Sequence, residues 1–157
     1  MIYSLFLYTL EGAINMNRHE LLIELNKDNF SFFHMGQDEC HIRLDDDSEI
    51  IIQLSDGSIS EKRMDLLKKI LENHEKDIAK AVRYLKNFDL DIGDNYFLYG
   101  IFVGEFNFGS HGRYLFDGFT VSLKRENGTI QDPQNSGIYT VQFKADGWPL
   151  GISLWFE

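Results

Sequence analysis

The sequence predicts a single α+β domain over residues 1–157, in which a curved antiparallel β-sheet carries one long helix, about residues 60–86, on one face. Three observations predict this fold. Apolar residues between Met64 and Leu85 recur at helical spacings, alternating apolar and polar residues fill the chain from Tyr96 onward, and two turn signals divide that second part into hairpins. A length of 157 residues suits one domain with a substantial core.

The first apolar segment, Ile2–Leu10, is expected to be a core strand or a short buried helix. It is too short to cross a bilayer, no Lys or Arg precedes it, and no small-residue cleavage site is evident after it. Met16, which opens the stretch MNRHELL, is an alternative start of the native chain.

Between residues 17 and 54 the pattern predicts a short helix and three strands. Asn17 and Glu20 are spaced for a helix cap, and this helix is expected to end near Lys27. The strands are expected in NFSFFHM, CHIRL and EIIIQL, with the turn Asp45–Ser48 joining the last two. Asp and Ser favour turns because their side chains bond to nearby backbone amides, so this acidic turn has a role in folding first.

The long helix is predicted from its start signal and its apolar face. Ser58 and Glu61 have the spacing of a capping box, with Ser60 as the alternative cap. Asn73 and His74 mark a place where the helix is expected to be open to a break. The apolar face consists of Met64, Leu67, Leu71, Ile78, Val82 and Leu85.

The C-terminal half predicts an antiparallel meander. NYFLYGIFVGEFNF and GFTVSLKRENGTI are rich in aromatic and β-branched residues, and Asn127-Gly128 is a hairpin signal because both residues tolerate positive φ. A second hairpin is expected around ADGWP, between YTVQF and GISLWF. In YTVQF, Tyr139, Val141 and Phe143 share one face, and the intervening threonine and glutamine share the other.

The charge and the cysteine count restrict the classes of partner. A net charge of −10 and a pI near 4.9 disfavour direct binding to nucleic acid phosphates and to anionic lipid, so we expect neither nucleic acid nor a membrane as a partner. Cys40 is the only cysteine, which excludes a disulfide within the chain and fits a reducing compartment, most simply the cytoplasm. Its predicted place is an ordinary buried position in a strand.

No motif in the sequence names a reaction, a cofactor or a metal. The five histidines form no H-E-x-x-H pair, and the acidic stretches lack the ligand order of an EF-hand loop. GEFNFGSHG lacks the spacing of the phosphate-binding and dinucleotide-binding motifs, and its predicted structure is a hairpin turn. We therefore expect a protein that is not an enzyme, with no catalytic residues, no cofactor and no metal site.

Two alternatives remain open at this level. One is a small-molecule-binding or enzymatic α+β domain, whose pocket lies between helix and sheet near His34, His111 and Tyr114. The other is a subunit of a homo-oligomer that pairs the edges of its sheets.

The acidic residues are concentrated in two segments. Asp38–Glu61 holds eight acids against one base, Arg43, and Asn87–Gly112 holds four acids and no Lys or Arg. If loops from the two segments meet, they form a negative face that attracts a basic protein. The expected partner-binding residues are Asp45, Asp46, Asp47, Glu49, Asp89, Asp91 and Asp94, with Trp148 as an anchor.

Two stretches also carry a resemblance. The turn LSDGSIS with the helix LLKKILENHEKDIAKAVRYL, and the end GIYTVQFKADGWPLGISLWFE, resemble small bacterial cytosolic domains of unknown function, some of which are immunity proteins of contact-dependent inhibition or polymorphic toxin systems. The resemblance covers about Glu49–Tyr84 and Gly137–Glu157, roughly a third of the chain, and the segment before Met16 has no counterpart in it. It brings no catalytic residues. It implies an immunity protein that binds and neutralises a cognate basic, nuclease-type toxin by covering its active site.

Overall fold

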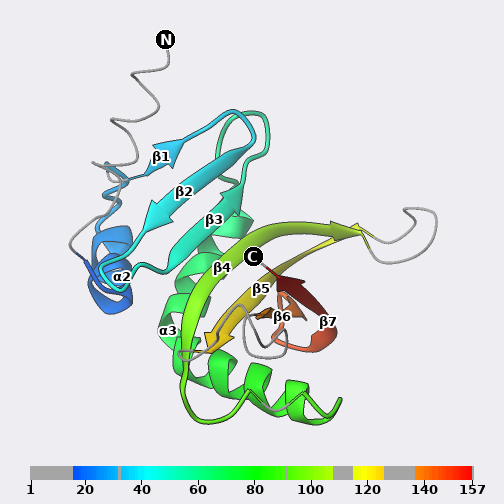
Figure 1. Cartoon of the computed structure of the whole chain (residues 1–157). Coiled ribbons are helices and arrows are strands. Elements are labelled where there is room, and N and C mark those ends of the chain that lie inside the picture. The colour runs from blue at the N-terminus through cyan, green and yellow to red at the C-terminus, as the bar shows by residue number, and fades with distance from the viewer. Residues whose placement is uncertain (1–15, 32, 91, 108–114, 126–136, 157) are drawn as a thin grey trace.

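The computed structural model describes residues 16–31, 33–90, 92–107, 115–125 and 137–156 (Figure 1). Within these residues, two helices and seven strands form an α+β fold, as predicted. Their bounds are α2 (Arg18–Asn26), β1 (His34–Met35), β2 (Glu39–Arg43), β3 (Glu49–Gln53), α3 (Glu61–Lys86), β4 (Tyr96–Asn107), β5 (Leu115–Arg125), β6 (Gly137–Lys144) and β7 (Pro149–Phe156).

The strands form one sheet in the order β1-β2-β3-β4-β5-β6-β7, so strands that are consecutive in the chain lie side by side. β3 and β4 are parallel, whereas the other neighbouring pairs are antiparallel. The antiparallel prediction differs from the structure at this one pair because α3 connects β3 to β4 as a crossover, which a parallel connection requires. β4 and β5 bend along their length, so the sheet departs from a plane (Figure 1).

The first helix is fixed by the predicted capping box. The Asn17 side chain accepts a hydrogen bond from the Glu20 amide at 2.9 Å, and the Glu20 carboxylate accepts one from the Asn17 amide at 2.9 Å. These two bonds satisfy amide donors that the helix itself leaves unpaired. Leu21 and Leu25 are fully buried, so α2 contributes to the core through one face.

The long helix α3 is capped by Ser60, which accepts a hydrogen bond from the Arg63 amide at 3.3 Å. Ser58 instead donates to the carbonyl oxygen of Ser55 within the preceding turn. The helix runs through Asn73 and His74 without a break, and both side chains contact carbonyl oxygens one turn earlier. Its buried apolar residues are Leu66, Leu67, Ile70, Leu71, Ala81 and Leu85, while Met64, Ile78 and Val82 are half-buried.

The helix covers one face of the sheet, and the core lies between them. Two rows of buried side chains cross the sheet on this face, namely Ile50–Ile101–Val121–Val141 and Ile52–Val103–Phe119–Phe143. The rings of Phe119 and Phe143 stack with their centroids 4.9 Å apart. Successive side chains along a strand point to opposite faces of the sheet. The residues between these buried ones therefore lie on the other face, which we call the open face.

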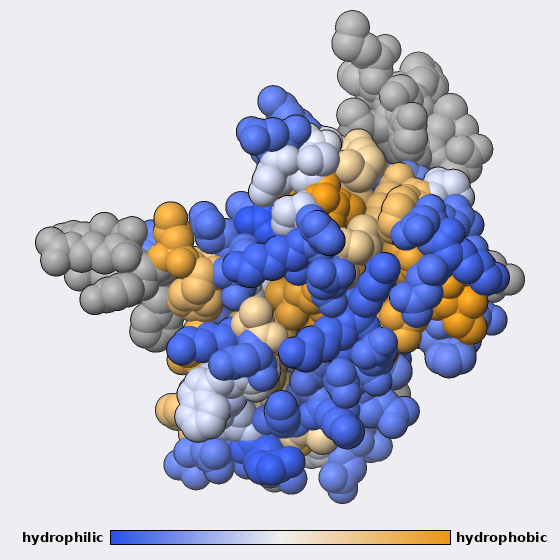
Figure 2. All heavy atoms as spheres, turned by 180° about the vertical axis from the view of Figure 1, so that it is seen from behind, coloured by the Kyte–Doolittle hydropathy of each residue, from blue (hydrophilic) through white to orange (hydrophobic). Residues whose placement is uncertain are grey.

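Seen from the opposite side, the surface is mainly hydrophilic, and hydrophobic residues show in patches between hydrophilic ones (Figure 2). This view agrees with the exposed charged residues on the outer side of α3, such as Lys69, Glu72 and Lys76. None of the helices within the described residues is both long and apolar enough to cross a membrane.

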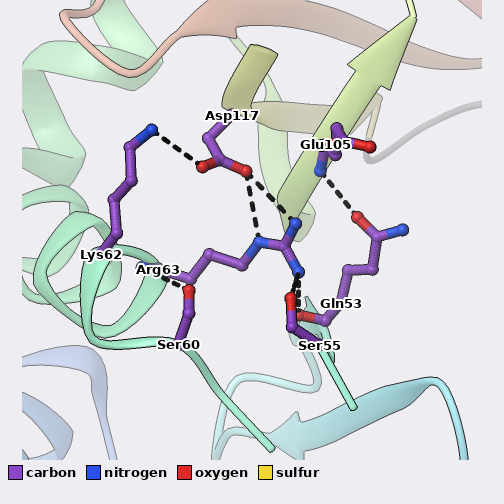
Figure 3. Close-up of polar contacts among 7 residues, drawn as sticks. All are labelled: Gln53, Ser55, Ser60, Lys62, Arg63, Glu105 and Asp117. Carbon is purple, nitrogen blue, oxygen red and sulfur yellow. Dashed lines mark hydrogen bonds and ion pairs between the residues drawn. The ribbon is translucent and has the colours of Figure 1, made fainter. Parts of the chain in front are cut away.

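A cluster of polar side chains joins the start of α3 to the sheet (Figure 3). Arg63 is buried and donates through Nη1 to the carbonyl oxygen of Gln53 (2.9 Å) and to Ser55 Oγ (3.0 Å). Its Nε and Nη2 donate to Oδ1 of Asp117 on β5, at 3.3 and 3.2 Å. Lys62 contacts the other oxygen of Asp117 at 3.1 Å. The cluster therefore fixes where α3 begins relative to β3 and β5.

Several predicted elements differ from the structure or lie outside it. The strand expected in NFSFFHM is limited to His34–Met35, and the Phe33 amide donates a hydrogen bond to the Phe30 carbonyl instead. Ile2–Leu10 and Asn127-Gly128 lie outside the described residues.

Candidate functional site

The open face carries a hollow with a volume of about 850 Å³. One row of residues across it is Glu49–Gly100–Ser122–Thr140–Ser153, and the next is Ile51–Phe102–Thr120–Gln142–Gly151. Five adjacent strands, β3 to β7, thus line a single hollow. It lies on the face opposite α3, because most of its side chains alternate with those of the core.

Glycines give this hollow its depth. Gly100 and Gly151 line it, and neither strand position carries a side chain to fill it. A Cβ on Gly100 would lie 2.9 Å from the carbonyl oxygen of Glu49, so only glycine allows β3 and β4 to approach closely there. A Cβ on Gly151 would meet no atom within 4 Å. The space that a side chain at position 151 would occupy is therefore empty.

Apolar side chains form most of the lining, with polar groups along its centre. Phe102 and Phe106 make an edge-to-face contact with centroids 5.6 Å apart, and Ile51 lies opposite Phe102 in register. Ser122 and Thr140 share a hydrogen bond of 2.7 Å between their hydroxyl oxygens. An apolar pocket with a few convergent polar groups is the usual form of a binding site.

Glu49 is the one charged residue among the described residues that line the hollow. Its Oε1 lies 2.8 Å from Nδ1 of His41 on β2, and Nε2 of His41 lies 3.2 Å from Glu39. Two carboxylates therefore share one imidazole, and the group keeps a negative charge even when that imidazole is protonated.

Two acids of the turn between β2 and β3 form ion pairs with arginines of α2 and β2. Arg18 contacts Asp46 at 2.6 Å, and Arg43 contacts Asp47 at 3.4 Å. Burial alone raises the pKa of Asp46, but the hydrogen bonds from Ser48 and the charge of Arg18 outweigh it, so this pKa lies below its ordinary value. Asp46 is therefore held as a carboxylate by the fold itself.

The other predicted acids lie at the same end of the sheet, because β3 and β4 are parallel and the chain enters both strands there. Asp89 and Asp94 are exposed in the segment between α3 and β4. Asp94 precedes Gly100, the partner of Glu49, by six residues, or about 20 Å of extended chain. Asp45, Asp89 and Asp94 form no ion pair with another described residue.

The remaining predicted residues either lie elsewhere in the fold or fall outside the described residues. Trp148 is 69% exposed in the turn between β6 and β7, which lies at the other end of the strands by register. Asp91, His111 and Tyr114 lie outside the described residues. His34 is on β1 and does not line the hollow, and the pocket expected between helix and sheet stays a prediction.

Chemistry at other positions is limited. Burial raises the pKa of the Cys40 thiol to about 11, so this thiol is protonated at neutral pH and is a poor nucleophile. No group of three or more His, Cys, Asp or Glu side chains suited to a metal ion occurs in the part of the chain that the structure describes.

Comparison with known proteins adds no relative: no protein-family model, curated protein or solved structure matches this chain.

Asp77, on α3, is the one acidic residue of the helix that is buried, at 7% exposure. Burial raises the pKa of its carboxyl, and the nearby charges of Lys80, His74 and Lys69 offset only part of this effect. The folded state therefore binds this proton more tightly than the unfolded state. This tighter proton binding favours folding at low pH. The stabilisation is lost as the pH rises above 3.8, the ordinary pKa of an aspartate carboxyl.

Asp77→Asn is accordingly expected to raise the free energy of unfolding at neutral pH and to change it little below the ordinary aspartate pKa. Denaturant unfolding of both proteins across this pH range measures the difference. Asp65→Asn, at an exposed position of the same helix, is the matched control and should leave stability unchanged. A loss of stability in Asp77→Asn at neutral pH would contradict this account.

Sequence reasoning missed the residues that line the hollow. Thr140 and Gln142 were correctly placed on the face opposite Val141, and that polar alternation was the available signal. The strand order decides which strands lie beside β6. It also places Thr120 and Ser122 on the same surface as Thr140 and Gln142.

Proposed function

We propose that this protein is a non-enzymatic binding protein, and most concretely an immunity protein. It binds a cognate basic, nuclease-type toxin in the cytoplasm and neutralises it by covering the toxin's active site. The observation that carries the proposal is the arrangement at one end of the sheet. There the acidic turn and the exposed acids before β4 flank the end of the hollow that Glu49 and Tyr99 line.

The charges at this end favour a cationic partner. Asp45, Asp89 and Asp94 are exposed and are not engaged in ion pairs with described residues, so their field reaches solvent. The net charge of −10 adds a long-range attraction to any basic protein. Such attraction raises association rates by about tenfold to a thousandfold and is screened by salt.

A nuclease supplies the complementary surface. The Lys and Arg residues that hold nucleic acid phosphates are available to acidic side chains of comparable spacing. An acidic protein that occupies them competes directly with the substrate, and it needs no catalytic group to do so.

The test uses the protein encoded immediately upstream of this gene as the candidate toxin. Its expression is expected to arrest growth, and co-expression of this protein is expected to relieve the arrest. The variant Asp45→Asn/Asp89→Asn/Asp94→Asn should lower the association rate about tenfold or more at low ionic strength, and much less at high ionic strength. Stopped-flow fluorescence measures these rates.

The control variant, Asp28→Asn/Asp56→Asn/Asp65→Asn, removes the same number of charges away from this end. Asp56 and Asp89 both have positive φ, of 52° and 57°, a conformation that asparagine also tolerates. The control should retain the association rate to within about twofold, as expected for distant charges screened by salt. Equal effects of the two variants, or an upstream protein that is harmless and does not bind, would contradict the proposal.

A further inference from the structure

The hollow on the open face is suited to one class of occupant, which can be named from its lining. Anions are disfavoured, because Glu49 is present and no Lys, Arg or His is found among the described lining residues. An entirely polar group is disfavoured as well, since Phe102, Phe106 and Ile51 form much of the surface. What fits is an apolar body beside a positive charge.

Polar groups at the centre suit a polypeptide. The side chains of Thr120 and Gln142 are adjacent in register and half-buried, and between them they offer both donors and acceptors. A peptide backbone has the same two kinds of group, spaced along the chain. The volume of about 850 Å³ is enough for a large side chain together with the backbone that carries it.

The hollow is also continuous with the acidic end. Glu49 is the first residue of β3, directly after the acidic turn, and is at the same time a lining residue. Cationic side chains at this end are engaged: Arg43 is paired with Asp47, Lys124 lies over the Tyr99 ring at 5.7 Å, and Arg125, which pairs with Tyr96 in register, donates to the Ile92 carbonyl oxygen at 2.7 Å. A basic segment that approaches the acidic end can therefore extend into the hollow past Glu49.

We propose that the hollow receives an apolar side chain, aromatic or aliphatic, that is flanked by arginine or lysine on the surface of a basic partner protein. The apolar side chain contacts Phe102 and Ile51, and the flanking cation contacts the Glu49 carboxylate. This inference rests on the proposed function, because it names what the partner inserts. Large apolar side chains in well-packed pockets usually supply most of the affinity of an interface, whereas surrounding charges set the association rate.

The test needs no partner. The probe is a short synthetic peptide with phenylalanine between two arginines, and the matched peptide has glutamates in place of the arginines. Titration followed by backbone amide NMR should shift the signals of Thr120, Gln142 and Gly151 with the arginine peptide, and should leave them in place with the glutamate peptide.

Two sets of variants locate the binding. Gly151→Phe fills the hollow from a position where the added carbon meets no neighbour, so it should abolish the shifts, whereas Gly151→Ala should retain them. Gln142→Lys should weaken the arginine peptide about tenfold or more, and Gln142→Glu should strengthen it. The opposite signs of the last two variants keep the test valid if Gly151→Phe does not fold.

Three results would overturn the inference. These are equal binding of the two peptides, shifts that persist unchanged in Gly151→Phe, and a dimer of this chain that Gly151→Phe converts to a monomer in sedimentation. Binding of the upstream protein separates the two proposals. If Gly151→Phe retains its affinity while the triple aspartate variant loses association rate, the proposed function stands and the occupant of the hollow is wrong.

Discussion

Asp117→Ala is expected to lower the free energy of unfolding by about 3–5 kcal/mol, as measured by urea denaturation. The reason is the position of Arg63, which is 7% exposed and directs two of its donors at Asp117. Without that carboxylate a guanidinium charge stays buried beside Gln53 and Ser55, which accept hydrogen bonds but carry no negative charge. Removing one partner of a buried ion pair costs far more than the pair contributes.

Two controls separate this cause from a general loss of packing. Lys62→Met removes the exposed contact to the same carboxylate and should cost less than about 1 kcal/mol. Arg63→Met/Asp117→Leu removes both buried charges and should recover much of the stability lost in Asp117→Ala. If the double variant is as unstable as Asp117→Ala, the buried charge is not the cause.

Gly118→Ala is expected to destabilise the protein by about 2–3 kcal/mol or more, the upper end of the range for overpacking. A Cβ on Gly118 would overlap the carbonyl oxygen of Phe143 on the neighbouring strand. That oxygen belongs to the backbone and cannot rotate away, so β5 and β6 would have to separate. The ring of Phe143 stacks on Phe119 in the core, so the disturbance would reach the packing beneath α3.

Gly151→Ala is the matched substitution, since Gly151 also lies in a strand on the open face but has no neighbour within 4 Å of its added carbon. It should leave stability unchanged or raise it by about 0.5 kcal/mol, because alanine restricts the unfolded chain. Thermal and urea unfolding compare the two variants. Equal stability of Gly118→Ala and Gly151→Ala would show that β5 and β6 are less closely paired than described.

The elements that were predicted well depend on residues close in sequence. The cap at Asn17 and Glu20, the long helix and the hairpin of β6 and β7 follow from local spacing and turn chemistry. The parallel pairing of β3 and β4 depends on where α3 returns the chain, and hairpin signals carry no information on that. The first strand is shorter than predicted, and the Phe33 amide donates a hydrogen bond to the Phe30 carbonyl instead.

The candidate site was harder to predict, because its parts are far apart in the chain. Arg18 lies 28 residues from Asp46 and pairs with it, so an acid that appears free in the sequence is engaged in the structure. Positive φ occurs at four of the described aspartates, Asp28, Asp47, Asp56 and Asp89. Aspartate tolerates this conformation better than most residues, so these positions are also explained by the backbone of the turns. Counting acids along the chain therefore overstates the charge that is available to a partner.

The parallel pair β3–β4 has a consequence for the kinetics of folding. Glu49 and Gly100 are partners although 51 positions separate them (100 minus 49), whereas the hairpins on either side close much shorter loops. Bringing distant segments together costs more chain entropy, so we expect β1–β3 and β4–β7 to form first and their joining, with α3 docked, to limit the rate. Substitutions between β3 and β4 would then slow refolding, and substitutions in the outer strands would chiefly accelerate unfolding.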